Sequence, residues 1–157
     1  MMAGERRNLR IVIETVQSKT FASALDWPGW DRPGGTEEAA IATLLAYADC
    51  YRPVVELAGL AGDLPETVAV IDRQPGNTTT TGFGVPVVVH AVEREAMSEA
   101  ECARQLALLQ ASWTFFDEVS RQVTPELKKG PRGGGRDRDG IIEHVINADR
   151  TYARKIG

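Results

Sequence analysis

Cysteine and histidine are scarce in this chain, and their scarcity limits the kinds of site it can build. The 157 residues include two of each. Cys50 and Cys102 belong to no C-x-x-C motif, so the sequence indicates neither a disulfide framework nor cysteine-based zinc binding. We expect both to be small buried hydrophobic residues inside helices, as in a protein of a reducing cytoplasm.

Long apolar runs and a large excess of charge are also missing. The longest apolar runs are far shorter than the ~20 residues that a helix needs to cross a bilayer. Residues 1–10 lack the apolar core of a signal peptide. The net charge of -4 gives no general attraction to nucleic acid or to acidic membranes. With 43% hydrophobic and 25% charged residues, we expect a soluble cytoplasmic protein that does not associate with membranes.

Arrangements that could catalyse a reaction are equally few. Ser112 and Ser120 lie in a predicted helix with no histidine placed beside them, so a Ser–His or Cys–His catalyst has no support. His90 lies in an apolar, strand-like run, and His144 lies in a predicted helix. A catalytic zinc site takes three protein ligands, and Glu143 points to a different side of the helix from His144. We therefore expect surface or hydrogen-bonded histidines and no cofactor.

What the chain does contain is a pattern of strands in its first half. Residues 9–16 are β-branched and apolar at alternate positions, which predicts a first strand. Residues 17–19 can turn the chain into a second strand at residues 20–27, giving a hairpin. Pro28 has no amide proton to donate and Gly29 permits a turn, so the second strand must end there.

A helix is predicted directly after this hairpin. Thr36 suits the N-cap, and the two glutamates after it suit the positive end of the helix dipole. The helix should run to Tyr51, with a break near Pro53, and its apolar stripe consists of Ile41, Leu44, Leu45, Ala48 and Tyr51. A third strand is predicted at residues 67–73. Residues 85–92 are a candidate for a fourth, which Pro86 either limits to an edge or starts at a later residue.

The second half of the chain has the pattern of helices. Ser98 and Glu101 have capping-box spacing, and the helix predicted at residues 98–122 carries the apolar residues Cys102, Leu106, Leu109, Trp113 and Phe116. After a glycine-rich loop, Asp139 can cap a final helix. Two helices cannot bury this much apolar surface, so we expect either a truncated chain or completion by a homodimer or protein partner.

These elements predict an α+β protein. Residues 1–96 should form a small antiparallel sheet with one packed helix. Residues 97–157 should form two antiparallel helices that make up part of a bundle.

Two short motifs in the first half resemble the HicB-like domain. The first is Asp-Trp-Pro-Gly-Trp at residues 26–30, where a strand ends, and the second is Gly-Thr-Glu-Glu-Ala at residues 35–39, where a helix begins. The resemblance implies a small sheet with a helix on one face, related to double-stranded-RNA-binding folds. Proteins of that family are often antitoxins that hold an RNase partner.

The second half resembles the start of a DinB-like helical bundle. The resemblance lies in the long helix with Trp113 and in Ile-Ile-Glu-His-Val-Ile-Asn-Ala-Asp at residues 141–149. In that family a histidine on the second helix binds a divalent metal, and a later helix adds two more in an H-x-x-x-H pattern. The resemblance places His144 at the first of these positions. The whole chain resembles uncharacterised proteins that join these two kinds of segment.

Two surfaces are candidates for binding. Asp26, Trp27 and Trp30 surround the Pro-Gly turn, where exposed indoles would anchor a partner and buried ones would cap the sheet core. The second candidate is a glycine-rich loop with five basic residues, which either is only solvated or binds polyanions such as RNA weakly. These residues are Lys128, Lys129, Arg132, Arg136 and Arg138.

The sequence therefore favours a non-catalytic binding or regulatory protein with an unidentified ligand. The alternative, implied by the DinB-like resemblance, is a metal-dependent enzyme such as a thiol transferase or hydrolase. Its metal site would need His144 and ligands from elsewhere.

Overall fold

The computed structural model describes residues 8–156, apart from residues 18, 66 and 131–132. The chain divides into two compact units, residues 1–112 and 113–157. The α+β class is confirmed. The predicted boundary between residues 96 and 97 falls just before a long helix and stays a prediction. In chain order the strands and helices are β1 (Asn8–Val16), β2 (Lys19–Ala24), β3 (Asp31–Gly34), α1 (Glu37–Ala46), α2 (Ala48–Leu57), β4 (Thr67–Pro75), α3 (Glu99–Gln122) and α4 (Arg138–Ile156).

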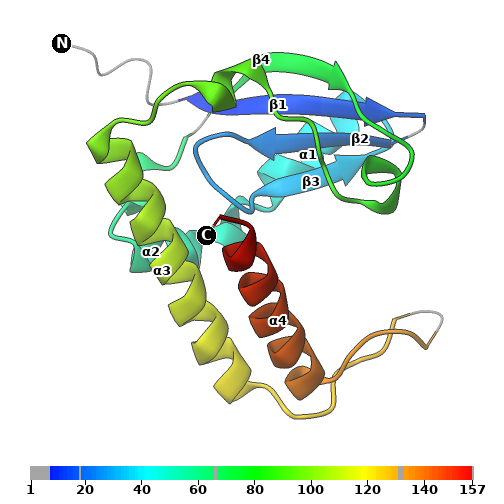
Figure 1. Ribbon diagram of the computed structural model, residues 1–157, viewed down its shortest axis with the longest axis vertical. Coiled ribbons are helices and arrows are strands. Elements are labelled where there is room, and N and C mark those ends of the chain that lie inside the picture. The colour runs from blue at the N-terminus through cyan, green and yellow to red at the C-terminus, as the bar shows by residue number, and fades with distance from the viewer. Residues whose placement is uncertain (1–7, 18, 66, 131–132, 157) are drawn as a thin grey trace. The chain divides into compact units, whose positions relative to one another are not determined.

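The four strands form one sheet in the order β3-β2-β1-β4 (Figure 1). β2 is antiparallel to β1 and to β3, whereas β4 is parallel to β1. The expectation of a wholly antiparallel sheet is therefore wrong for β4. The reason is the connection: α1 and α2 carry the chain back along the sheet, so β4 runs in the same direction as β3 and β1.

Two of the predicted strands, each recognised from the residue pattern within its own segment, are confirmed. β1 matches the strand predicted at residues 9–16, and β4 matches the one at 67–73. β2 stops at Ala24, earlier than predicted, because the Ala24 amide donates to the carbonyl of Trp30 and closes a turn. The strand predicted at residues 85–92 is wrong: residues 85–90 have no regular structure, and a short 3-10 helix follows, Ala91–Arg94.

Helix α1 covers the sheet face that carries the apolar side chains of β1. The Thr36 hydroxyl accepts a hydrogen bond from the Ala39 amide, which confirms the predicted N-cap. Ala40 and Leu44 are its buried residues. The helix ends at Ala46, and Tyr47 separates it from α2, so the break lies before Pro53, which is inside α2. Buried residues on this face include Leu9, Ile11, Ile13, Ala22 and Ala24.

The long helix α3 begins with the predicted capping box. The Ser98 amide donates to the Glu101 carboxylate at 2.8 Å, and the Glu101 amide donates to the Ser98 hydroxyl at 3.2 Å. Several apolar side chains of α3 stay largely exposed, among them Leu106, Leu109 and Trp113. The homodimer or protein partner expected from this surface remains a prediction.

Among the described residues no helix is long and apolar enough to cross a membrane.

The expectation that both cysteines are buried is wrong. Cys50 and Cys102 are both exposed. Cys102 lies off the face of α3 that holds the buried Leu108 and Ala111. On α2 the adjacent Tyr51 takes the inward position, where it stacks on a tryptophan ring.

Candidate binding site

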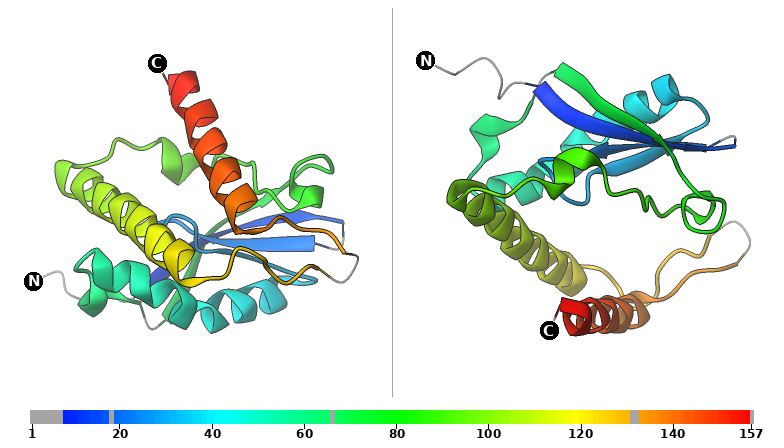
Figure 2. Two further views of the ribbon diagram at one scale, coloured as in Figure 1. Left: turned by 90° about the horizontal axis from the view of Figure 1, so that it is seen from below. Right: turned by 45° about the horizontal axis from the view of Figure 1, so that its top comes forward.

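A pocket of about 440 Å³ lies on the sheet face opposite α1. Its floor comes from β2 and β3, and part of its wall comes from the chain that follows β4. We call residues 76–90 the strap, because they cross this face of the sheet (Figure 2). The residues that line the pocket are Lys19, Phe21, Asp31, Pro33, Gly34, Gly35, Gly84 and Pro86.

The register of the strands fixes the order of the groups on the floor. Phe21 on β2 lies opposite Pro33 on β3, and Ser23 lies opposite Asp31. Alternate residues of a strand share a face, so the side chains of Lys19 and Phe21 point the same way. Lys19 is four residues from Ser23, which is ~13 Å at ~3.3 Å per residue. Lys19 and Asp31 are therefore placed at opposite ends of the floor, with Phe21 and Pro33 between them.

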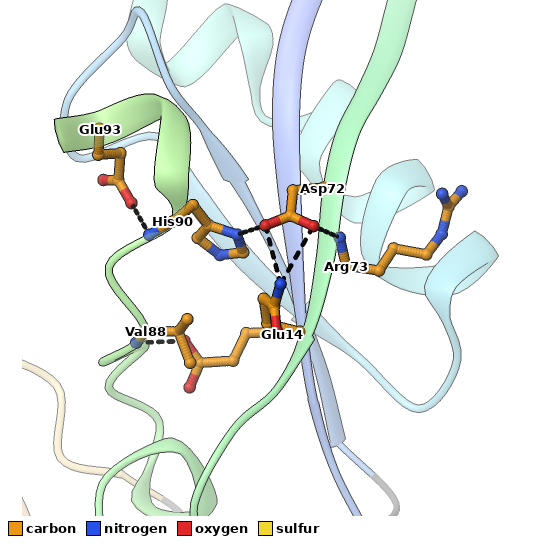
Figure 3. Close-up of polar contacts among 7 residues, drawn as sticks. Glu14, Asp72, Arg73, Val88, His90 and Glu93 are labelled. Carbon is orange, nitrogen blue, oxygen red and sulfur yellow. Dashed lines mark hydrogen bonds and ion pairs between the residues drawn. The ribbon is translucent and has the colours of Figure 1, made fainter. Parts of the chain in front are cut away.

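Glu14 on β1 holds the strap against the sheet. The residue is only 2% exposed. One carboxylate oxygen accepts a hydrogen bond from the Thr81 hydroxyl, and the other accepts from the amides of Val87 and Val88 at 2.9 Å each. Figure 3 shows the contact with Val88. A buried carboxylate needs such donors to replace its hydration. These bonds also help explain why residues 85–90 are not a strand, since the amides of Val87 and Val88 donate to Glu14 instead of to a neighbouring strand.

A close approach at Gly76 completes this attachment. A Cβ atom at Gly76 would lie 2.6 Å from a Glu14 carboxylate oxygen and 2.6 Å from the Thr81 hydroxyl oxygen. The Gly76 amide donates to the Thr15 carbonyl at 2.8 Å. Only glycine leaves room for the carboxylate and the hydroxyl to meet here.

His90 anchors the far end of the strap. It is buried, and its Nδ1 lies 2.7 Å from a carboxylate oxygen of Asp72 on β4 (Figure 3). Its amide donates to the Glu93 carboxylate at 2.8 Å. Asp72 also accepts from the Gln74 side chain and the Arg73 amide. These bonds, with that of His90 the largest cause, lower the pKa of Asp72. The expectation of a hydrogen-bonded His90 is confirmed.

The two charged groups of the pocket differ in their surroundings. The Lys19 ammonium is exposed and donates to the carbonyl of Gly82 in the strap. Burial raises the pKa of Asp31, against the opposing effects of a hydrogen bond from Ser23 and the charge of Arg32. The pocket thus offers one accessible cation and one carboxyl group that has lost part of its hydration.

The tryptophans of the predicted recognition turn pack into the core. Trp27 and Trp30 are 3% and 1% exposed. The indole of Trp30 donates to the Leu44 carbonyl at 2.8 Å and stacks on Tyr51. Asp26 forms a two-point ion pair with Arg10, with contacts of 2.6 and 2.8 Å. Of the two alternatives for this turn, the structure shows the one in which the indoles cap the sheet core.

Two basic residues of the glycine-rich loop form ion pairs with nearby aspartates. Lys129 pairs with Asp137 at 2.6 Å, and Arg138 pairs with Asp139 at 2.8 Å. Lys128 and Arg136 are exposed. Arg132 lies outside the described residues. Binding of polyanions by this loop stays a prediction.

His144 is an exposed residue of α4. Within the described part of the chain no three His, Cys, Asp or Glu side chains are grouped so that they could hold a metal ion. A metal at His144 stays the alternative prediction.

Sequence reasoning did not find the pocket, because its residues come from three separate segments. The one local signal was Glu14, a carboxylate directly after the apolar run of residues 11–13 in β1. Comparisons with models of protein families, with curated proteins and with solved structures found no match to this chain. The HicB-like and DinB-like resemblances stay predictions.

Proposed function

We propose that this chain is a non-catalytic binding protein of the cytoplasm and that its ligand occupies the pocket on the sheet. The observation that carries the proposal is a wall held in place by a buried carboxylate. Glu14 fixes the strap at Thr81, Val87 and Val88, on both sides of the lining residues Gly84 and Pro86. Because this wall is already ordered in the free protein, the chain loses little conformational entropy when a ligand binds.

The chemistry of the pocket also supports binding. Its volume of about 440 Å³ lies in the range of ligand sites, which are mainly apolar with a few polar groups. The described lining residues supply an ammonium, a carboxyl group, a phenyl ring, prolines and glycines, and none of them is a hydroxyl or thiol nucleophile. The free cysteines Cys50 and Cys102 are consistent with a reducing compartment.

The test uses isotope-labelled full-length protein and a library of small fragments that carry a carboxylate, an ammonium group or neither. Binding should shift the amide signals of Phe21, Gly34 and Gly84. Gly35→Phe should abolish these shifts, because a side chain at Gly35 would enter open space in the pocket. Gly62→Phe is the matched control, since Gly62 also faces open space but does not line the pocket. Absence of shifts, or shifts that survive Gly35→Phe, would contradict the proposal.

A further inference from the structure

The floor of the pocket is long and has opposite charges at its ends. The Cα atoms of Lys19 and Asp31 lie ~13 Å apart along the direction of β2, as the strand register and the rise per residue require. Phe21 and Pro33 lie opposite each other between them. A ligand that satisfies both charged groups must be extended, must be apolar in its middle and must carry charges of opposite sign.

The borders of the pocket are suited to a polypeptide backbone. Gly35, directly after β3, and Gly84 of the strap both line the pocket, and a Cβ at either position would meet no atom within 4 Å. Neither residue has a side chain that would keep a peptide backbone away, although the Gly84 amide already donates to the Thr81 carbonyl at 3.0 Å. Beside Gly84, the strap exposes valines at alternate positions, Val85, Val87 and Val89, which are 58%, 46% and 56% exposed.

We infer that the occupant of this pocket is an extended peptide segment with an acidic side chain, an apolar side chain and a basic side chain at positions i, i+2 and i+4. This inference rests on the proposed function. Side chains at these spacings share one face of an extended chain, and four residues span ~13 Å. The acidic side chain pairs with Lys19, the basic one pairs with Asp31, and the apolar one covers the exposed Pro33. Phe21 beside it is only 4% exposed and contributes its ring edge to the floor.

The state of Asp31 supports the cationic end of this peptide. Burial is the main cause that raises the pKa of this carboxyl group. A ligand ammonium beside it would replace part of the lost hydration and favour the charged carboxylate. The charges also set the register of the peptide, since a shift by one residue would turn all three side chains away from the floor.

The probes are four peptides with acetylated N-termini and amidated C-termini, so that only side chains carry charge. Glu-Thr-Leu-Thr-Lys is the matched peptide. Lys-Thr-Leu-Thr-Lys, Glu-Thr-Leu-Thr-Glu and Gln-Thr-Leu-Thr-Gln are the controls. Titration into labelled full-length protein should shift pocket amides most strongly with the matched peptide. The controls should bind about three- to tenfold more weakly, as expected for partly exposed ion pairs and like-charge contacts.

Charge reversal in the protein provides a readout that misfolding cannot imitate. Lys19→Glu should make Lys-Thr-Leu-Thr-Lys the preferred peptide, and Lys19→Gln should weaken the matched peptide without reversing the preference. Lys155→Glu, an exposed lysine of α4, should leave the preference unchanged. If fragments bind the pocket but the matched peptide does not, or if its binding is indifferent to Lys19→Glu, the inference fails and the proposed function stands. If neither class of probe binds, both fail.

Discussion

Glu14 on β1 accepts a hydrogen bond from the hydroxyl of Thr81, a residue 67 positions later in the chain, and both side chains are buried. This contact joins a central strand to the irregular strap. Because the second oxygen of Glu14 binds two further amides, one side chain organises the wall of the candidate site. Stability and binding should therefore depend on the same carboxylate.

Glu14→Gln should destabilise the protein by about 2–3 kcal/mol. The substitution replaces a charged acceptor by an amide whose NH2 group would face buried donors, and hydrogen bonds to charged groups contribute about 1.5–3 kcal/mol. Urea denaturation measures the loss. The amides of Val87 and Val88 should also exchange with solvent faster. Glu56→Gln, at an exposed position of α2, should change stability little, and an equal loss in both variants would contradict the role given to Glu14.

Gly34→Ala should be strongly destabilising, by at least about 2 kcal/mol. A Cβ at Gly34 would lie 2.2 Å from the Ala40 amide nitrogen and 2.6 Å from the Ala39 carbonyl carbon, and backbone of α1 cannot move aside as a side chain can. At the neighbouring Gly35 the same atom meets nothing within 4 Å, so Gly35→Ala should stay within about 1 kcal/mol of the parent. Thermal melts of the two variants compare them directly. Equal stability would show that α1 does not pack so closely on β3.

Features of the fold that depend on neighbouring residues could be predicted from the sequence, and those that depend on distant contacts could not. The Thr36 cap and the strand at β1 depend on neighbouring residues, and each was predicted. The second strand was also predicted, but it ends at Ala24, before the Pro-Gly turn. β3 was missed because Asp-Arg-Pro-Gly has low strand propensity. It exists because its residues pair with β2 and because Gly34 lets α1 approach.

The site was less predictable than the fold because it depends on contacts between residues that are far apart in the sequence. Whether Asp31 and Lys19 face one pocket depends on strand register, and whether residues 85–90 form a strand depends on which acceptor takes their amides. For Val87 and Val88 that acceptor is Glu14, more than 70 residues earlier in the chain. A carboxylate directly after an apolar run predicts some buried partner, but it does not identify which segment provides it.

Asp31→Asn should stabilise the protein at neutral pH. Burial raises the pKa of Asp31 above its ordinary value of 3.8, with the charge of Glu93 adding to the effect and that of Arg32 opposing it. The folded state then binds a proton more tightly than the unfolded chain, so the stability contributed by Asp31 falls as pH rises from the ordinary pKa through the raised one.

The stabilisation by Asp31→Asn should therefore be complete above the raised pKa and vanish below the ordinary one. Melting temperatures measured from pH 3 to pH 7 test this, with Asp49→Asn, an exposed position of α2, as control. A gain that does not depend on pH would show that the desolvated charge is not its cause.

The basic loop should bind polyanions weakly and in a salt-sensitive manner. Lys128 and Arg136 are exposed, whereas Lys129 and Arg138 already pair with carboxylates. Replacing Lys128 and Arg136 by Ser should therefore remove more heparin or RNA retention than replacing Lys129 and Arg138. Retention is measured on a heparin column with a salt gradient, since counterion release makes such binding depend on ionic strength. Retention that survives replacement of all five basic residues, including Arg132, would remove the loop as a binding site.

The DinB-like alternative can be tested by the metal content of the protein. We expect no stoichiometric transition metal, because zinc sites take three or four protein ligands. His144 is exposed on α4, and His90 is committed to Asp72 at 2.7 Å. Two copies of His144 brought together by a dimer would still be one ligand short. Elemental analysis of protein purified without chelator, beside the His144→Ala variant, gives the answer. About one metal ion per chain in the parent and none in the variant would favour the enzyme over the binding protein, since only a site built on His144 responds to that change.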